Sequence, residues 1–232
     1  MEYRQLGKTG LLVSEIGMGC EGFVDKPYAQ VKELVDAMEA GGVNCIDLYT
    51  PNPEFRSNLG RALRGRREKF VLQAHLCTIW KDEQYKRTRD LAEVREGFGD
   101  QLRRLGTDHT EIGMIHYVDS MADWETVRTG GVLDYAKELK ARGVIGHIDL
   151  SSHNPEVALA AVNSGAIEVL MFSINPCYDL QPAGEDVEQL WNEQNYAQPL
   201  VNMDPQRQAL YETCQRLGVG ITVMKAFGGG DL

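Results

Sequence analysis

The feature that most constrains the fold is a repeated alternation of short apolar runs with helical patterns. We expect strands at the seven apolar runs, which are residues 15–19, 43–49, 70–76, 112–117, 144–151, 168–174 and 220–225. Six helical patterns lie between them, and Asn154-Pro155 and Asp204-Pro205 supply the cap and first residue of two of these helices. Alternation of this kind predicts βα units and a parallel sheet. A doubly wound sheet and a barrel both fit the pattern, so periodicity leaves that choice open.

Composition and charge exclude several classes of protein and partner. Apolar residues make up 43% of the chain and charged residues 25%, which excludes disordered, collagen-like and disulfide-scaffold proteins. The formal net charge is −10, and because nucleic acids and anionic membranes both select a basic face, we expect neither as a partner. The 5 cysteines stand singly without a CxxC pair, and we interpret them as reduced thiols of a cytoplasmic protein. No apolar run approaches the roughly 20 residues that a membrane-spanning helix needs.

The start of the chain carries a resemblance that favours the barrel. Residues 3–19 place Gly7 to Gly10 as a turn between two short extended arms. This segment resembles the opening of the aldo-keto reductases, in which a hairpin closes the bottom of a (β/α)8 barrel. The resemblance continues in order through residues 42–47, 59–63, 105–108, 114–117 and 143–148. It implies an α/β fold of the TIM type and one domain over residues 1–232, with its hairpin at residues 1–14.

The end of the chain departs from that pattern. The sequence stops at Leu232, shortly after the seventh expected strand, so we expect the last βα unit of the barrel to be missing from this chain. In the family this unit grips the 2′-phosphate of the cofactor, so the residues present do not distinguish NADP from NAD. The resemblance itself implies NADP(H), with NAD(H) as the alternative. The resemblance is to a divergent bacterial branch in which some members carry an iron-sulfur segment. Closely spaced cysteines for such a cluster are absent from this chain.

The resemblance implies reduction of a small aldehyde or ketone by hydride from NAD(P)H, with an Asp, Tyr, Lys, His tetrad. Asp47 matches the aspartate and His116 the histidine. Asn52 stands in place of the tyrosine, and His75 in place of the lysine. The chemistry needs a group that protonates the developing alkoxide, and an asparagine cannot do so at neutral pH.

Two side chains are candidates for the missing proton donor. Tyr49 shares a side of its strand with Asp47 if the alternation of side chains holds there. His75 carries an imidazole, which titrates near neutrality, and we expect it to share a pocket with His116 and Asp47. Each has a structural reading as well, Tyr49 as an aromatic packing under a loop and His75 as a polar residue within the barrel. We favour His75 as the donor.

The positions that the resemblance implies for cofactor binding are Gly19, Cys20, Asp47, Ser151, Ser152, Met171 and Met224. The two serines would hold the carboxamide of the nicotinamide. Met224 replaces an aromatic that stacks on the ring, and a thioether can pack on a ring face, although a core methionine is the alternative reading.

Two further segments follow expected strands at the catalytic end. Residues 178–203, which include Trp191 and Tyr196, form a long polar stretch that we interpret as a lid or specificity loop, with a disordered insertion as the alternative. Residues 77–80 end in Trp80 and are expected to line the same pocket. His109 precedes the fourth strand and receives no function.

Two other functions stay open. The first is a metal-binding barrel enzyme, because His75, His116, His153 and Asp47 come from strand ends, although no short ligand spacing supports a site and we assign no metal ligands. The second is a catalytically silent barrel that binds a small molecule or a protein partner. The sequence does not predict an oligomeric state.

Overall fold

A computed structural model describes residues 1–180 and 202–227 of the chain. All seven strands expected in the parallel sheet are present, and every pairing recorded between them is parallel. They are β3 (Met18–Gly19), β4 (Cys45–Leu48), β5 (Val71–Leu76), β8 (Thr110–Ile115), β9 (Ile145–Ser152), β10 (Val169–Ser173) and β11 (Gly220–Met224). The first strand is shorter than expected because the Glu15 N–H donates to the Glu2 carbonyl, which prolongs the N-terminal hairpin instead.

The six expected helices also form, with the predicted caps. They are α1 (Tyr28–Gly41), α2 (Pro53–Leu63), α3 (Leu91–Leu105), α5 (Val132–Ala141), α6 (Pro155–Asn163) and α9 (Pro205–Leu217). Asn154 Oδ1 accepts from the Glu156 N–H at 2.9 Å, and Asp204 Oδ1 accepts from the N–H groups of Gln206 and Arg207. These side chains satisfy backbone donors that the first turn of a helix leaves open.

Several elements were not predicted from the sequence. They are the antiparallel hairpin of β6 (Thr78–Lys81) and β7 (Gln84–Arg87), the helices α4 (Met121–Thr129) and α7 (Pro176–Asp179), and the 3-10 turns η1 (Cys20–Phe23) and η2 (Arg67–Lys69). The strands β1 (Tyr3–Gln5) and β2 (Leu12–Ser14) pair antiparallel within residues 1–14. Among residues 1–180 and 202–227, no helix combines the length and apolar character that crossing a bilayer requires.

The chain divides into two compact units. The first comprises Met1–Gln5, Leu11–Ile115 and Val127–Ile148, and the second comprises Leu6–Gly10, His116–Thr126 and Asp149–Leu232. The first unit holds β3, β4, β5 and β8, the second holds β10 and β11, and β9 begins in the first and ends in the second. Within each unit the order of the parallel strands follows the chain, without the reversal of a doubly wound sheet.

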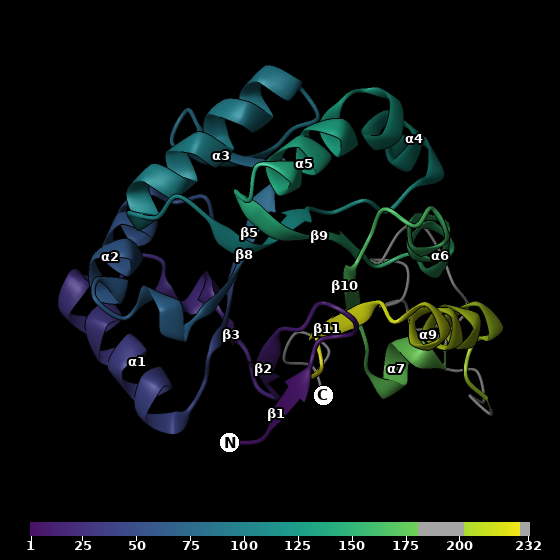
Figure 1. Cartoon of the computed structure of the whole chain (residues 1–232), viewed down its shortest axis with the longest axis horizontal. Coiled ribbons are helices and arrows are strands. Elements are labelled where there is room, and N and C mark those ends of the chain that lie inside the picture. Colours follow the sequence, from purple (N-terminus) through teal and green to yellow (C-terminus); the bar gives the residue numbers. More distant parts are fainter. Residues whose placement is uncertain (181–201, 228–232) are drawn as a thin grey trace. The chain divides into compact units, whose positions relative to one another are not determined.

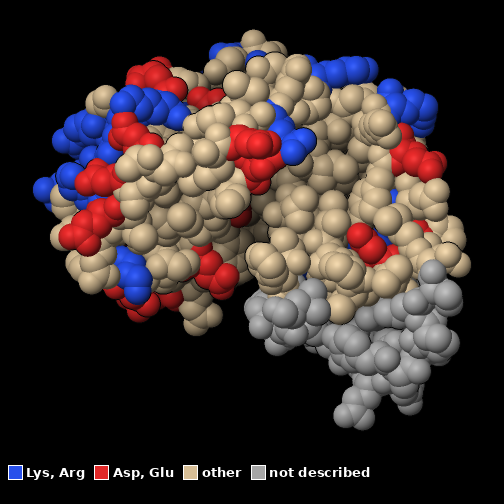
Figure 2. Space-filling view, turned by 90° about the horizontal axis from the view of Figure 1, so that it is seen from below, with Lys and Arg blue, Asp and Glu red and all other residues tan. Residues whose placement is uncertain are grey.

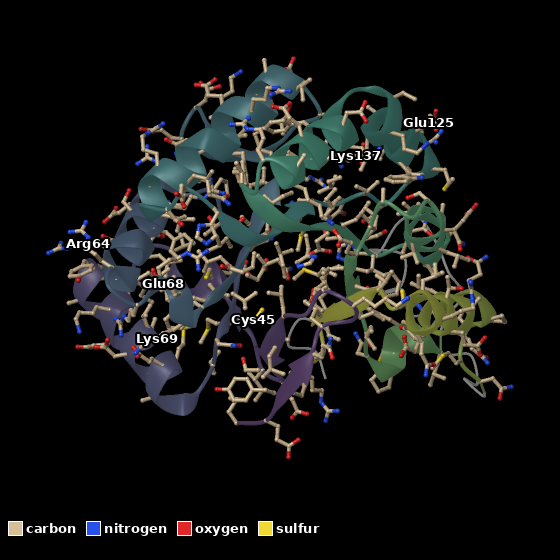
Figure 3. The ribbon with its side chains drawn as sticks, viewed as in Figure 1. Cys45, Arg64, Glu68, Lys69, Glu125 and Lys137 are labelled. Atoms are coloured by element: carbon tan, nitrogen blue, oxygen red, sulfur yellow. The ribbon has the colours of Figure 1, made fainter. Side chains whose placement is uncertain are left out.

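The first unit packs its helices against strands that are buried on both faces. All six residues of β5 are buried, as expected of a parallel strand covered by helices. Helix α2 packs against both α1 and α3, along one side of the strands (Figure 1). Figure 3 labels Cys45, which lies buried at the start of β4, and Arg64, which projects outward after α2.

The surface of the first unit carries charges of both signs. On the left of Figure 2, over the elements near α1 and α2, acidic and basic side chains are intermixed. Arg66 lies 2.7 Å from Asp36 and 2.9 Å from Glu39, and the hydrogen bonds from Lys32 and Arg66 lower the pKa of Asp36.

All five cysteines lie in the described part of the chain, and none forms a disulfide.

The second unit is centred on β10, whose five residues are all buried. Arg207 of α9 is buried against it, and its Nη1 donates to the Ser173 carbonyl at 2.9 Å. The turn at residues 6–10 belongs to this unit, where the Lys8 N–H donates to the Gly218 carbonyl at 2.8 Å. Gly7 has a φ of +55°, and a Cβ there would lie 2.3 Å from the Gly220 nitrogen, so only glycine fits this approach.

Candidate active site

Strained backbone marks the carboxyl ends of the strands. Cys77 follows β5, Tyr117 lies just beyond β8, and Lys225 follows β11, with φ values of +67°, +57° and +56°. A left-handed conformation at a non-glycine residue costs about 1–2 kcal/mol and is typical of functional sites. The carboxyl ends of parallel strands are also where α/β folds place their active sites. The left-handed residues and the usual location of active sites in α/β folds therefore both favour the carboxyl ends of the strands in each unit.

In the first unit, β4 and β5 bring together Asp47 and His75. Their strands are neighbours, with Leu48 opposite Ala74, so both side chains reach the same end of the sheet. His75 Nε2 lies 2.6 Å from Asp47 Oδ1, a hydrogen bond that the nitrogen donates to the carboxylate. The His75 side chain is 1% exposed and that of Asp47 is 21% exposed. The carboxylate is therefore the accessible end of this pair.

Tyr49 directly follows β4, and its side chain packs on His75. Its ring meets the imidazole edge-on, with ring centroids 6.2 Å apart and an interplanar angle of 86°. Its other neighbour is Tyr85 of β7, on which it stacks with centroids 5.9 Å apart. Tyr49 is partly exposed, so its ring and the Asp47 carboxylate form the accessible surface of the group.

Gly19 and Cys20 adjoin the same group through β3. Gly19 pairs with Asp47 in the parallel register. Cys20 is fully buried, and burial followed by the charge of Asp47 raises the pKa of its thiol well above the usual value, so the thiol stays neutral. Gly19 is exposed, and no atom lies within 4 Å of the position a Cβ would take there. The backbone at Gly19 is therefore open to a flat ligand.

In the second unit, Ser151 fixes the strained segment that follows β8. Its Oγ accepts from the Tyr117 N–H at 2.7 Å, and its carbonyl accepts from the Val118 N–H at 2.9 Å. The Tyr117 ring contacts the rings of His116 and His153, with centroids 6.0 and 5.2 Å away. His116 is 6% exposed, so this histidine is enclosed by its neighbours.

Asp119 is the centre of a buried hydrogen-bond network in this unit. It accepts from the His153 N–H at 2.7 Å, from His153 Nδ1 at 2.9 Å and from Ser152 Oγ at 3.1 Å. Its own carbonyl accepts from Asn154 Nδ2 at 3.0 Å. Burial alone would raise the pKa of Asp119, but the hydrogen bond and charge of His153 outweigh it and bring the pKa below its usual value. The Ser152 hydroxyl, which is fully buried, is therefore committed to this network.

Replacing Asp119 with asparagine is expected to lower the free energy of unfolding by about 3 kcal/mol at pH 7, because it leaves buried donors without their carboxylate. The pKa of Asp119 is lower in the folded protein than in the unfolded chain. Its contribution is therefore complete above the unfolded value of about 3.9 and is lost as the pH falls through the folded value. Urea unfolding of both proteins at pH 7 and pH 3 measures this. A difference that is equal at the two pH values would contradict the assignment.

The two methionines lie on β10 and β11. Met171 is buried, and its N–H donates to Asp149 Oδ1 at 3.2 Å. Met224 ends β11 opposite Ser173 and is half-buried. Lys225 follows it, and burial lowers the pKa of its amine while the charge of Asp119 opposes that shift. Sequence reasoning missed Lys225 as a site residue, although it is the last residue of an expected strand.

Asn52, the residue at the position of the family's tyrosine, has a structural task. It is the N-cap of α2, and its Oδ1 accepts from the Phe55 N–H at 2.9 Å. Sequence reasoning also missed Asp119 and Tyr85. Asp119 stands three residues after His116, which is a usable signal, but Tyr85 belongs to a hairpin that was not predicted.

Other predictions concern metals and the long loop. Among the residues that the structure describes, no three His, Cys, Asp or Glu side chains are grouped to hold a metal ion. Of the candidate ligands, Asp47 bonds to His75, whereas His153 bonds to Asp119, which was not among the candidates. Of the predicted lid, residues 181–201 lie outside the described part of the chain.

The comparisons with known proteins agree with one another. The model of the Aldo/keto reductase family matches residues 15–232. The Bacillus subtilis (strain 168) proteins named Uncharacterized oxidoreductase YqkF and Aldo-keto reductase YhdN are both 27% identical to the chain, over 188 and 165 residues. These matches cover 78% and 67% of this chain but 58% and 48% of the relatives, so the chain spans about half the length of the curated relatives it matches.

Solved structures share the fold. PA4992 from Pseudomonas aeruginosa is 25% identical with a TM-score of 0.72, and the match covers 96% of this chain and 77% of that one. The aldo-keto reductase AKR11C1 from Bacillus halodurans, in its holo form, is 23% identical with a TM-score of 0.76, covering 99% of this chain and 68% of that one. The predicted fold class, an α/β fold of the barrel type, is confirmed.

Proposed function

Because the chain belongs to the aldo/keto reductase family, we propose that it reduces an aldehyde or ketone with hydride from NAD(P)H. The observation that carries the proposal is the hydrogen bond of 2.6 Å between Asp47 and His75 at the carboxyl ends of β4 and β5. Hydride addition to a carbonyl carbon leaves an alkoxide that must take up a proton, and this pair holds one. NADP(H) is our first choice of donor and NAD(H) the alternative.

Each unit, considered by itself, contains residues that suit contact with a nicotinamide ring. No protein side chain supplies a hydride, so the dinucleotide supplies it when bound. In the first unit the open backbone at Gly19, beside Cys20 and Asp47, suits a flat ring. In the second unit we assign ring packing to the half-buried thioether of Met224.

The remaining cofactor candidates are buried, so we assign them indirect roles. Ser151, Ser152 and Met171 are all at least nine-tenths buried. We propose that Ser151 acts by holding Tyr117 in place, and that Ser152 acts through the Asp119 network rather than by reaching the carboxamide itself.

The proposed proton path runs through Asp47. His75 is buried, so the proton held between the pair reaches the surface at the Asp47 carboxylate, which passes it to the alkoxide oxygen. The pair then takes up a new proton from solvent. The carbonyl carbon gains the hydride, the oxygen gains the proton, and the dinucleotide is left oxidised. His116 lies in the second unit, and we keep it as a catalytic candidate of that unit. Tyr49 is the second candidate donor, because its ring is partly exposed beside the pair.

The His116→Ala variant is expected to lose on the order of a hundredfold in turnover, because removal of one catalytic hydrogen-bond donor usually costs that much. Steady-state oxidation of NADPH with a panel of aldehydes measures it. His109→Ala is the matched control, since His109 precedes β8 and is exposed at the opposite end of the strand. Unchanged turnover in His116→Ala would remove His116 from the site.

The class of function is tested by binding. Titration of NADPH and NADH against the fluorescence of the protein, with metal analysis of the same sample, separates the alternatives. Tight dinucleotide binding supports the reductase, whereas stoichiometric zinc or iron without it would support a metal enzyme. If neither the dinucleotides nor a metal is bound, the remaining alternative is a catalytically silent barrel that binds another small molecule or a protein partner.

A further inference from the structure

Lys225, at the carboxyl end of β11, has a strained backbone that is held in place by hydrogen bonds. Its φ of +56° lies in the left-handed region, which costs a non-glycine residue about 1–2 kcal/mol. Its carbonyl accepts from Asn175 Nδ2 at 2.9 Å, and the carbonyl of Met224 before it accepts from the Ile174 N–H at 3.3 Å. All of these residues belong to the second unit. Strain that the surroundings maintain in this way is typical of functional positions.

The amide that holds Lys225 is itself fixed. Asn175 is buried and is the N-cap of α7, where its Oδ1 accepts from the Tyr178 N–H at 3.0 Å. Its Nδ2 is used on Lys225 and its Oδ1 on the helix. A buried amide that is bonded at both ends is rigid, so the point from which the Lys225 side chain starts is well defined.

The amine of Lys225 lies within range of the Asp119 charge without an ion pair to it. The Asp119 carboxylate accepts instead from the His153 N–H, from His153 Nδ1 and from Ser152 Oγ. Within the part of the chain that the structure describes, no carboxylate forms an ion pair with Lys225. Burial of this half-buried side chain therefore outweighs the charge of Asp119 and lowers the pKa of the amine.

Lys81 has the opposite arrangement. Its side chain is 50% exposed, its amine donates to Glu93 at 2.7 Å, and that hydrogen bond raises the pKa of the amine. A larger share of the Lys225 amine is therefore uncharged at neutral pH. An uncharged, partly desolvated lysine amine is a nucleophile toward carbonyl carbon.

We propose that Lys225 is a covalent binding site for small uncharged aldehydes, which it takes up as an imine. The amine nitrogen attacks the carbonyl carbon, the carbonyl π bond opens, and a proton moves from nitrogen to oxygen to give a carbinolamine. The hydroxyl group then leaves as water with the remaining N–H proton, and the C=N bond forms. One amine and one aldehyde give one imine and one water, without any change of oxidation state.

The surroundings of Lys225 favour an uncharged ligand. The Asp119 carboxylate is charged at neutral pH, because its pKa is below the usual value, and it disfavours an anionic carbonyl compound. A protonated imine carries the same charge as the ammonium group that it replaces, so the balance with Asp119 is kept. The half-buried Met224 and the exposed Ala226 and Phe227 flank Lys225 with apolar side chains. The site therefore favours propanal over glyoxylate.

The test is labelling of the wild-type protein with propanal and sodium cyanoborohydride at pH 7, without a dinucleotide. The cyanoborohydride reduces each imine to a stable propylamine, and mass spectrometry of the digested protein gives the rate at each lysine. Lys225 is expected to react about tenfold faster than a free surface amine, because more of it is uncharged and its position is fixed. Lys137, labelled in Figure 3, is the reference, since its side chain is 54% exposed on α5. Glyoxylate is expected to show no preference for Lys225.

A variant of the supporting amide tests the geometry. Asn175→Asp keeps an acceptor for the cap of α7 but cannot donate to the Lys225 carbonyl. Labelling of Lys225 in this variant is expected to fall to the rate of Lys137. Asn58→Asp is the matched control, because Asn58 Nδ2 donates to the carbonyl of Lys26 at 3.4 Å in the first unit. It should leave the labelling of Lys225 unchanged.

The rates in the wild-type protein decide the proposal even where a variant fails to fold. Labelling of Lys225 by propanal within about twofold of the rate of Lys137, or slower, would overturn it, as would an equal preference of glyoxylate for Lys225. The proposed reduction is tested separately, because labelling involves no dinucleotide and Asp47 lies in the first unit. Fast labelling in a protein that reduces no aldehyde would support the covalent site and contradict only the reductase.

Discussion

The Asp47→Asn variant is expected to lose about a hundredfold or more of the rate of carbonyl reduction. The carboxylate is the accessible end of the pair with His75, and an amide can neither hold the imidazole by charge nor pass a proton. General acid catalysis by a positioned group contributes about 10²–10⁴-fold, so most of that factor should disappear. Single-turnover oxidation of bound NADPH isolates the chemical step from product release.

The chain offers a matched control for this change. Asp108 and His109 form a similar pair, with Nδ1 2.8 Å from Oδ1, but both are exposed and precede β8. Asp108→Asn should leave the rate unchanged. A rate in Asp47→Asn within about threefold of the wild-type rate would show that the pair does not carry the proton.

The Gly60→Ala variant is expected to lose about 3 kcal/mol of unfolding free energy, although alanine is the better helix former. Gly60 lies in α2 where α3 passes, and a Cβ there would be 2.4 Å from the Arg104 carbonyl oxygen and 2.6 Å from Leu105 Cα. Both contacts are backbone atoms, so relief requires the two helices to separate.

Gly99→Ala on α3 is the control, because nothing lies within 4 Å of its added Cβ. This variant should gain up to about 1 kcal/mol, as alanine replaces glycine in a helix. Urea unfolding gives both values. Equal effects of the same sign at the two positions would contradict the close packing of α2 on α3.

The sequence predicted those elements of the fold whose ends carry a recognisable cap or turn residue. Asn154 and Asp204 cap their helices because each stands before a proline at the first helical position, and this arrangement is legible in the sequence alone. The hairpin of β6 and β7 lacked such a signal. Its turn places Asp82 and Glu83 in the left-handed region, at φ values of +51° and +58°, where a glycine or asparagine would have indicated the turn.

The sequence predicted several residues of the candidate site, but it did not predict all the contacts that these residues make. Asp47 and His75 were expected in one pocket, and their contact follows from neighbouring strands. The burial of His75 was not predictable, because Tyr49 covers it while stacked on the missed hairpin. The Ser152 hydroxyl was expected to reach the cofactor, but it bonds to Asp119, 33 residues earlier in the chain, and no local pattern records that contact.

The most direct test of the proposed proton path is the pH dependence of single-turnover hydride transfer in the wild type, His75→Gln and Tyr49→Phe. An imidazole ordinarily loses its proton near pH 6.5 and a phenol near pH 10, so the two candidate donors differ in the range where the rate declines. We expect the wild-type rate to fall as the pH rises above neutrality, His75→Gln to be slow at every pH, and Tyr49→Phe to keep the wild-type profile. Loss of the reaction in Tyr49→Phe with full activity in His75→Gln would contradict the account, as would a reaction that survives both changes.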